Sequence, residues 1–224
     1  MSLPKPYYEK DGLVIYNADC RDILPHLPQV DLVLTDPPYG IGADRNLRAN
    51  KQHGKAASPS KDYGVGNWDS APPSAETFEE ILKAGTHHVI WGGNYFPLPA
   101  GQSCWLVWDK DNGNNGYADC ELAWTDLPRA VRKIRFRWMG MLQENMAEKE
   151  FRFHPTQKPV PVMRWCIELF PGTAQTICDP FLGSGATLVA AKELGRKAIG
   201  IEIEEKYAEI AAKRLAQEVF DFKA

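Results

Sequence analysis

The sequence lacks the features that mark several protein classes. It has no CxxC pair, and its five cysteines are scattered through 224 residues, so neither a zinc site nor a disulfide framework is expected. No apolar run approaches the roughly 18 residues of a membrane span, and no signal peptide opens the chain. A GxxxxGK[ST] motif is also missing, which excludes a P-loop. These absences favour a cytoplasmic protein with reduced, buried thiols and no metal site.

Composition fits one globular domain with a large core, because 44% of the residues are hydrophobic. The net charge of −3 argues weakly against a protein that coats nucleic acid. The charge is segregated along the chain, however. Arg129–Arg137 holds five basic residues and no acid, whereas acids gather in Glu202–Glu218 and Glu76–Glu80.

Predicted strands alternate with predicted helices along most of the chain. Apolar runs predict strands over 13–16, 30–35, 88–91, 104–108, 120–124, 175–178 and 197–201. Helical spacing predicts helices over 21–27, 74–84, 160–170, 185–194 and from 204 to about 220. This alternation indicates an α/β fold with a mostly parallel sheet. Residues 41–73 lack periodicity, so we expect a long, mobile, functional loop there.

A glycine-rich turn, DPFLGSG, joins a predicted strand to a predicted helix at Asp179–Gly185. Gly183 and Gly185 allow a tight turn and let a ligand approach the backbone, and the free N–H groups of the helix start favour a polar or negative group. Glu202 lies 19 positions after Gly183, at the end of the next strand. An acid at about that distance typically accepts hydrogen bonds from a ribose. The unit therefore predicts an adenosine-type cofactor.

The kind of cofactor follows from two departures from the dinucleotide fingerprint. Leu188 stands where that fingerprint has its third glycine, which disfavours NAD or FAD and makes a nicotinamide oxidoreductase the least favoured function. Asp179 in the turn would repel a pyrophosphate but attract an ammonium group. An adenosine that carries an amino acid fits this pattern, and S-adenosylmethionine is the obvious candidate.

DPPY at Asp36–Tyr39, DPFLGSG at Asp179–Gly185 and HPTQKP at His154–Pro159 occur together in this chain. In this order they resemble the amino-methylating DNA methyltransferases, which act on adenine N6 or cytosine N4. YNADC, WGGNYF and DCELAWT also resemble segments of that family, so the match covers most of the chain from Leu13 to Leu215. The position of DPPY ahead of the cofactor half resembles the permuted β-type subgroup.

The resemblance implies a circularly permuted Rossmann-like methyltransferase fold, with a seven-stranded, mostly parallel sheet flanked by helices. We expect a single domain over 1–224. Residues 13–125 would form the target-amine half with its loop at 41–73, 126–153 a short DNA-recognition segment, and 154–220 the cofactor-binding half.

The DPPY segment is predicted to hold the target amine of a flipped-out base. Asp36 would accept one amino hydrogen and the Pro37 carbonyl the other, while the Tyr39 ring would stack on the base. Pro37 and Pro38 restrict the backbone, so these groups are expected to be in place before a base arrives.

The cofactor site predicted from the resemblance is larger. It comprises Asp19, Cys20, Thr156, Lys158, Asp179, Pro180, Phe181, Gly183, Ser184, Gly185 and Glu202. Asp179 is implied to bind the methionine amino group and Glu202 the ribose hydroxyls. Asp19 and the Cys20 backbone would lie at the adenine edge. Phe181 would supply an apolar wall, and Thr156 and Lys158 would approach the methionine carboxylate.

Double-stranded DNA is the expected partner, and basic residues in two segments are predicted to contact its phosphates. These residues are Arg45, Arg48, Lys51, Arg132, Lys133, Arg135 and Arg137. Only residues 126–153 are available for target recognition, which leaves three explanations open: a short recognition segment, one shared across a homodimer, or the 41–73 loop. The resemblance also admits a cognate restriction nuclease as a partner.

Adenine N6 is the preferred target, because family members with Ser in place of Asp36 tend to methylate cytosine. Cytosine N4, RNA or another amine stay open as targets. Relatives that methylate protein glutamine carry Asn at this position, so Asp36 counts against them. A catalytically silent DNA-binding module is the alternative from another class, and the intact Asp36, Tyr39, Asp179 and Glu202 argue against it.

Overall fold

Parallel strands at the centre of a mixed sheet determine where the functional residues lie. In the computed structural model, the nine strands of this sheet that the described residues form follow the order β1-β2-β11-β10-β3-β4-β6-β5-β7. The structure describes residues 3–42, 69, 71–113, 118–139, 142–147, 149–153, 156–170 and 172–217.

The strands of the main sheet are β1 (Tyr8–Lys10), β2 (Leu13–Asn17), β3 (Val30–Thr35), β4 (Gly85–Trp91), β5 (Trp105–Asp109), β6 (Cys120–Thr125), β7 (Arg132–Arg135), β10 (Thr176–Asp179) and β11 (Lys197–Glu202). A separate two-stranded sheet pairs β8 (Trp138–Met139) with β9 (Leu142–Gln143). The helices are α1 (Cys20–Ile23), α3 (Ala75–Ala84), α4 (Val160–Glu168), α5 (Ala186–Glu193) and α6 (Glu205–Ala216), with short 3-10 turns η1 (Leu24–His26) and η3 (Gly93–Tyr95).

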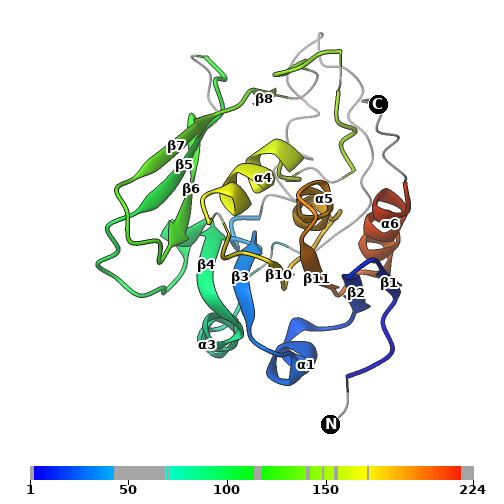
Figure 1. Ribbon diagram of the computed structural model, residues 1–224. Helices are drawn as coiled ribbons and strands as arrows, with labels where there is room; N and C mark the ends of the chain where they lie inside the picture. Colours follow the sequence, from blue (N-terminus) through cyan, green and yellow to red (C-terminus); the bar gives the residue numbers. More distant parts are fainter. Residues whose placement is uncertain are drawn as a thin grey trace.

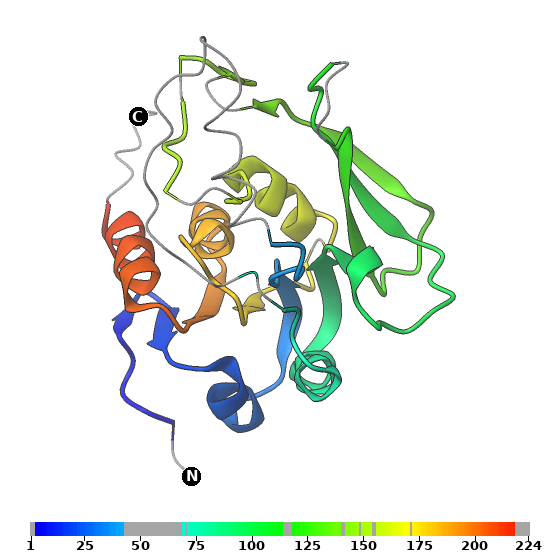
Figure 2. The same ribbon diagram turned by 180° about the vertical axis from the view of Figure 1, so that it is seen from behind.

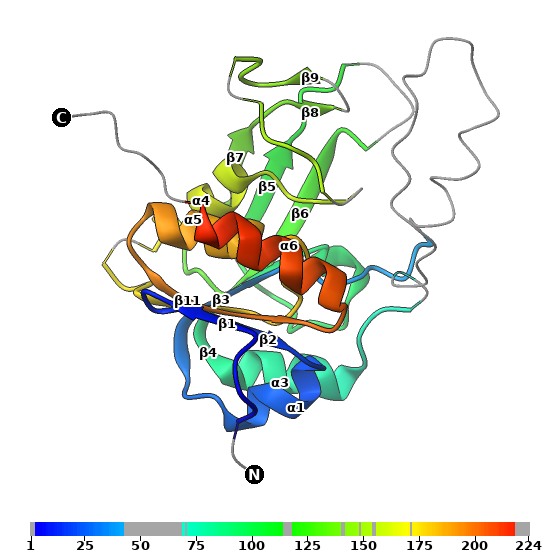
Figure 3. The same ribbon diagram turned by 90° about the vertical axis from the view of Figure 1, so that its right-hand side faces the viewer.

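The helices cover both faces of the main sheet. Helices α4, α5 and α6 lie on one face, and α1 and α3 lie on the other (Figures 1 and 3). Seen from either side, α6 and the edge strand β7 lie at opposite ends of the molecule (Figures 1 and 2). This is the layered α/β architecture that the alternation of strands and helices predicts.

A topological switch point lies between β10 and β3. Strands β2, β11, β10, β3 and β4 all run parallel, so their carboxyl ends share one edge of the sheet. The connection from β3 to β4 runs through α3 on one face, whereas the connection from β10 to β11 runs through α5 on the other. In open α/β sheets, ligands bind in the crevice that such a reversal opens at the carboxyl ends.

Burial on both faces explains why β3 is a continuous apolar run. Leu32, Val33 and Leu34 are fully buried, and so are Ile177 and Cys178 on the neighbouring β10. At the start of both strands, the Asp31 carboxylate accepts hydrogen bonds from the backbone N–H groups of Gln175 and Thr176, at 2.9 and 2.8 Å. These contacts hold β3 beside β10.

Most predicted elements are confirmed within one or two residues. β3 has the predicted bounds, and Ser74 caps α3 by accepting a hydrogen bond from the Thr77 N–H. The strand count differs from the expected seven because β1 and β7 extend the sheet at its edges. Charged residues fill β7, so it lacks the apolar pattern of a strand.

The cysteines match the predicted buried thiols with one exception. All five cysteines are free, and four are buried as expected, but Cys120 is exposed. Among the helices of the described residues, none has both the length and the apolar character needed to cross a membrane.

Candidate active site

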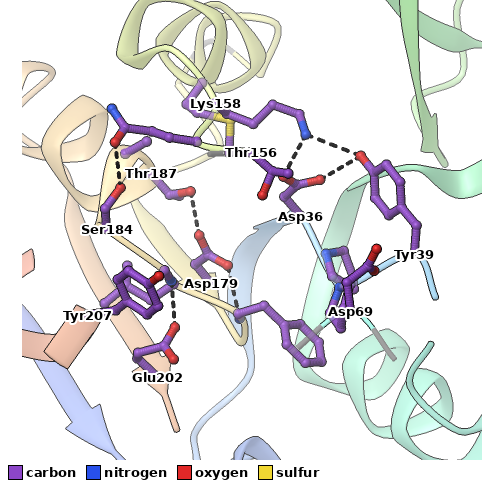
Figure 4. Close-up of a pocket in the computed structure, with 18 of the residues that line it drawn as sticks. Asp36, Tyr39, Asp69, Thr156, Lys158, Asp179, Ser184, Thr187, Glu202 and Tyr207 are labelled. Carbon is purple, nitrogen blue, oxygen red and sulfur yellow. Dashed lines mark hydrogen bonds and ion pairs between the residues drawn. The ribbon is translucent and has the colours of Figure 1, made fainter. Parts of the chain in front are cut away.

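A pocket of about 460 Å³ opens at the switch point, beyond the carboxyl ends of β3, β10 and β11 (Figure 4). This volume lies within the range of about 300–1,000 Å³ that small-molecule sites occupy. Asp36 comes directly after β3, Asp179 ends β10 and Glu202 ends β11. Three carboxylates from three parallel strands therefore face one space.

The DPPY segment forms one wall of the pocket. The Tyr39 hydroxyl donates a hydrogen bond to Asp36 Oδ1 at 2.7 Å, which fixes both side chains relative to each other. The Tyr95 ring stacks on Tyr39 with ring centroids 5.0 Å apart and planes inclined by 17°. Tyr39 lines the pocket but Tyr95 does not. We call the ring face that Tyr95 stacks on the outer face and the opposite one the inner face.

Gly92 makes room for the Tyr39 ring. Its φ of +71° is in the left-handed region that favours glycine, and a Cβ atom at this position would lie 2.2 Å from Tyr39 Cε1. The ring position therefore depends on the missing side chain of Gly92.

Lys158 brings a buried positive charge to the same wall. Its Nζ lies 2.5 Å from Asp36 Oδ2 and 3.2 Å from the Tyr39 hydroxyl (Figure 4). Glu121 Oε2 lies 2.9 Å from the same Nζ, and Lys110 pairs with Glu121 Oε1. The Lys158 side chain is only 5% exposed.

These contacts determine the protonation states of the titratable side chains in this wall. Burial raises the pKa of Asp36, an effect that the Lys158 ammonium opposes and the Glu121 charge reinforces. Burial also opposes ionisation of Glu121, but the ammonium groups of Lys158 and Lys110 outweigh it and lower the pKa of Glu121 to about 2. The two carboxylates outweigh the burial of Lys158 and raise its pKa, so Lys158 is charged at neutral pH.

The second wall is the glycine-rich turn after β10. Asp179 accepts hydrogen bonds from the hydroxyls of Thr35 and Thr187, at 2.7 and 2.5 Å, and from the Phe181 N–H at 3.1 Å. It is only 3% exposed, and burial raises its pKa to about 6 despite these donors. A buried carboxylate of this kind gains free energy when a cation binds beside it.

Glu202 closes the far end of the pocket. Its carboxylate accepts the N–H groups of Gly183 at 2.7 Å and Glu204 at 2.9 Å. Burial raises its pKa to about 7. Gly183 is thus held by the acid that lies 19 positions later, so the turn and the acid form one unit.

The pocket has the chemistry that S-adenosylmethionine requires. Asp179 can receive a cationic amine, and Glu202 can receive hydroxyl hydrogens. Phe181, Ile203 and Tyr207 supply apolar and aromatic surface between and beside these acids. No cluster of metal-binding side chains occurs among the residues that the structure describes.

Most of the predicted catalytic and cofactor-binding residues line this one pocket. They are Asp36, Pro37, Pro38, Tyr39, Thr156, Lys158, Asp179, Phe181, Gly183, Ser184 and Glu202. The structure directs the Lys158 ammonium to Asp36 and Glu121, and its predicted contact with a methionine carboxylate stays untested.

Four predicted cofactor residues lie outside the pocket lining. Asp19 caps α1 by accepting the Arg21 N–H and forms an ion pair with the Arg21 side chain, and Cys20 is buried beside it. Pro180 is part of the turn but does not line the pocket. A Cβ atom on Gly185 would lie 2.8 Å from Ala211 Cβ, so this glycine allows α5 to pack closely on α6.

Sequence reasoning missed several lining residues, among them Asp69, Trp108, Lys110, Glu121, Trp138, Gln157 and Tyr207. Glu121 had a usable signal, because it is the only charged residue in the β6 strand, CELAWT. The indole N–H of Trp138 is buried and has no hydrogen-bond partner among the residues described. Asp69 accepts the Gly40 N–H at 2.8 Å, which anchors the end of the DPPY segment.

The predicted DNA contacts of the second basic segment lie on the exposed edge strand β7 and just beyond it. Lys133 forms an ion pair with Asp109, and Arg135 and Arg137 both pair with Asp111. The Arg132 side chain donates to the backbone carbonyl of Val131. Three of these four cations share two carboxylates and Arg132 pairs with a carbonyl, so basic side chains outnumber their acidic partners at this edge. Arg45, Arg48 and Lys51 lie outside the described residues.

Comparisons with known proteins find methyltransferases. The N6/N4 methyltransferase family model, described as "DNA methylase", matches residues 98–213, more than half of the chain. The chain is 27% identical to the Type II methyltransferase M2.DpnII of Streptococcus pneumoniae, over 96% of this chain and 94% of that protein. It is 29% identical to the Type II methyltransferase M2.LlaDCHI of Lactococcus lactis subsp. cremoris, over 95% and 93% of the two chains.

Solved structures show the same fold. The M1.HpyAVI–SAM complex has a TM-score of 0.53 at 23% identity and covers 91% of this chain and 98% of its own. The cytosine-N4-specific PvuII DNA methyltransferase has a TM-score of 0.61 at 14% identity, over 97% of this chain and 91% of its own.

The role of Gly92 can be tested against Gly101, which also has positive φ but where an added Cβ atom would have nothing within 4 Å. Gly101→Ala should cost about 1–2 kcal/mol of unfolding free energy through backbone strain alone. Gly92→Ala should cost more, because it must also displace the Tyr39 ring. Urea unfolding of both variants measures the difference; equal costs would show that the Tyr39 ring does not depend on Gly92.

Proposed function

The chain belongs to the N6/N4 DNA methylase family and is an S-adenosylmethionine-dependent DNA methyltransferase, and we propose that its target is the N6 amine of adenine in double-stranded DNA. The observation that carries the proposal is the Asp36 carboxylate, which lies on the pocket wall next to Tyr39 and one strand away from Asp179. The aspartate itself supports adenine, because relatives with Ser at this position tend to methylate cytosine.

The protein's main task is to aim a weak nucleophile. The lone pair of the target amine is delocalised into the base ring, so it must be turned toward the methyl carbon. In the proposed complex Asp36 and the Pro37 carbonyl each accept one amino hydrogen, which tilts the nitrogen toward a tetrahedral shape. The inner face of Tyr39 stacks on the base and helps offset the few kcal/mol needed to flip it out of the duplex.

The bound cofactor supplies a methyl group on a sulfonium sulfur, and the amine nitrogen takes it as the carbon–sulfur bond breaks and its electron pair returns to sulfur. Asp36 then accepts the proton that the methylated nitrogen releases. The burial that raises the pKa of Asp36 favours this proton transfer.

In the cofactor half, we assign Asp179 to the methionine ammonium, Glu202 to the ribose hydroxyls and Phe181 to an apolar wall. Thr156 lies in the pocket within the segment before α4 and is assigned to the methionine carboxylate. Lys158 would have to leave Asp36 to reach that carboxylate. Asp19 and the Cys20 backbone stay our proposal for the adenine edge.

We assign the phosphate contacts to the β7 edge, and with it the recognition role proposed for 126–153. For so short a recognition segment, a homodimer in which two copies share the target is the accompanying proposal. Relatives named Type II methyltransferases support a cognate restriction nuclease as a further partner.

The proposed target can be identified directly. The protein is incubated with S-adenosylmethionine and unmethylated plasmid DNA, and the DNA is digested to nucleosides for mass spectrometry. We expect N6-methyladenine, and Asp36→Asn should lower its yield by roughly 100-fold or more, because the amine loses its proton acceptor. N4-methylcytosine instead would overturn the choice of adenine, and near-normal turnover by Asp36→Asn would overturn the role of this carboxylate.

Cofactor affinity should fall in acid. Glu202 and Asp179 have pKa values of about 7 and about 6 in the free protein. Each must be ionised to bind a hydroxyl or ammonium hydrogen, so protonation competes with binding and weakens affinity by up to about tenfold per pH unit below each pKa. Calorimetric titration with S-adenosylhomocysteine from pH 8.5 to 5.5 measures this pH dependence of affinity. Asp179→Asn should reduce the fall in affinity at the acidic end of the range. A constant affinity across the range would contradict the assignment.

The β7 edge should contribute salt-dependent DNA affinity. Arg132→Ala should weaken binding of unrelated DNA sequences equally and reduce the slope of log affinity against log salt by about 1. Lys83→Ala is the matched control, because Lys83 lies in α3, away from the β7 edge. This variant should leave the slope unchanged. Filter binding at a series of salt concentrations measures both; an unchanged slope for Arg132→Ala would remove β7 from the DNA surface.

A further inference from the structure

Both carboxylate oxygens of Asp36 already have partners in the ligand-free protein, and one of these partners is the Lys158 ammonium. Asp36 Oδ1 accepts the Tyr39 hydroxyl at 2.7 Å, and Asp36 Oδ2 contacts the Lys158 ammonium at 2.5 Å (Figure 4). The proposed reaction requires the same carboxylate to accept a hydrogen of the target amine. Lys158 therefore competes with the substrate for Asp36.

Charge makes this competition sharper during the reaction. The amine nitrogen becomes positive as it takes the methyl group, and an ammonium group on the neighbouring oxygen would repel it in a buried, weakly screened site. The Lys158 side chain is 5% exposed, so it cannot simply turn its charge to solvent. It needs a second buried anion.

Glu121 provides that anion. Its Oε2 lies 2.9 Å from Lys158 Nζ, close enough for an ion pair. The same buried oxygen accepts no hydrogen bond from any residue that the structure describes, whereas Lys110 holds Oε1. A small rotation of Lys158 would give Glu121 Oε2 a directed hydrogen bond and release Asp36.

We infer that Lys158 is a positioning residue that changes how it shares its charge: it bridges Asp36 and Glu121 when the pocket is empty and keeps only Glu121 when a target amine reaches Asp36. In the first state its charge opposes the effect of burial and favours the ionised form of Asp36. In the second it withdraws a positive charge from the reacting nitrogen. This inference rests on the proposed methyl transfer. It adds a role for Lys158 and Glu121, neither of which contacts the reacting atoms in the proposed complex.

The test compares methylation rates of three variants, Glu121→Gln, Lys158→Met and the two combined, at saturating S-adenosylmethionine and unmethylated plasmid DNA. Glu121→Gln should be slow, because Lys158 has lost its second partner and stays on Asp36. Adding Lys158→Met to Glu121→Gln should then raise the rate by roughly fivefold over Glu121→Gln alone, because the competing ammonium is gone. A double variant that is as slow as Glu121→Gln, or slower, would overturn the inference.

The pH dependence of the same methylation rate distinguishes this electrostatic role from a role in packing alone, which would not shift the profile. Asp36 faces Tyr39 on its own segment, Lys158 ahead of α4, Glu121 on β6 and Asp179 on β10. Lys158→Met removes a cation, so the acidic limb of the profile should move to higher pH. Glu121→Gln removes an anion, so the limb should move to lower pH. Shifts in the same direction would contradict the inference.

Controls separate this inference from the proposed function and from misfolding. A wild-type protein that methylates no DNA refutes the function, whereas an active wild type with additive variants refutes only the exchange of partners. Lys83→Met with Glu80→Gln removes an exposed ion pair on α3 and should leave the rate unchanged. If Glu121→Gln does not fold, as judged by thermal unfolding, the same comparison is made with Glu121→Asp, which keeps the charge but shortens its reach. There too, adding Lys158→Met should raise the rate, and a further loss would overturn the inference.

Discussion

The hydrogen bond from the Thr35 hydroxyl to the Asp179 carboxylate connects the two halves of the site. Thr35 ends β3 and Asp36 follows it, so the residue that holds Asp179 lies directly before the residue that we propose for the target amine. The bond is 2.7 Å long and fully buried, where a hydrogen bond to a carboxylate is strong and its loss costly. It exists because β3 and β10 are neighbours at the switch point, with Asp31 joining their other ends.

The charges around the two acids on either side of this bond, Asp179 and Asp36, differ. Burial raises the pKa of Asp179, and Asp36 lies close enough for its charge to add to this effect, which suits a pocket that receives a cationic cofactor. The charges of Lys158 and Lys110 balance Asp36 and Glu121 on the target side. On the cofactor side no such cation is close to Asp179 among the contacts of the described residues, and in our proposal the methionine ammonium of the cofactor takes this place.

The sequence predicted the parts of this arrangement that local patterns encode. The apolar run of β3, the turn from Asp179 to Gly185 and the acid at Glu202 each carry a signal of spacing or composition. Order along the chain and the rule for parallel sheets were enough to place Asp36 and Asp179 at one edge.

Contacts between distant residues could not be predicted in this way. No local pattern indicates that the Lys158 ammonium lies between two acids that come 122 and 37 residues earlier in the chain. Gly185 was interpreted as an approach for a ligand, and the structure shows a helix contact with Ala211. The β7 strand was hidden because an exposed edge strand carries charge instead of an apolar pattern.

The two halves are proposed to hold the target amine and the methyl donor face to face across β3 and β10. A bisubstrate analogue, with adenine N6 linked covalently to the position of the transferred methyl group, tests this arrangement most directly by calorimetry. We predict binding roughly 100-fold tighter than that of S-adenosylhomocysteine, as expected for a mimic of the transition state, and tighter than that of the matching cytosine N4 analogue. Binding of both analogues no tighter than S-adenosylhomocysteine would contradict the arrangement.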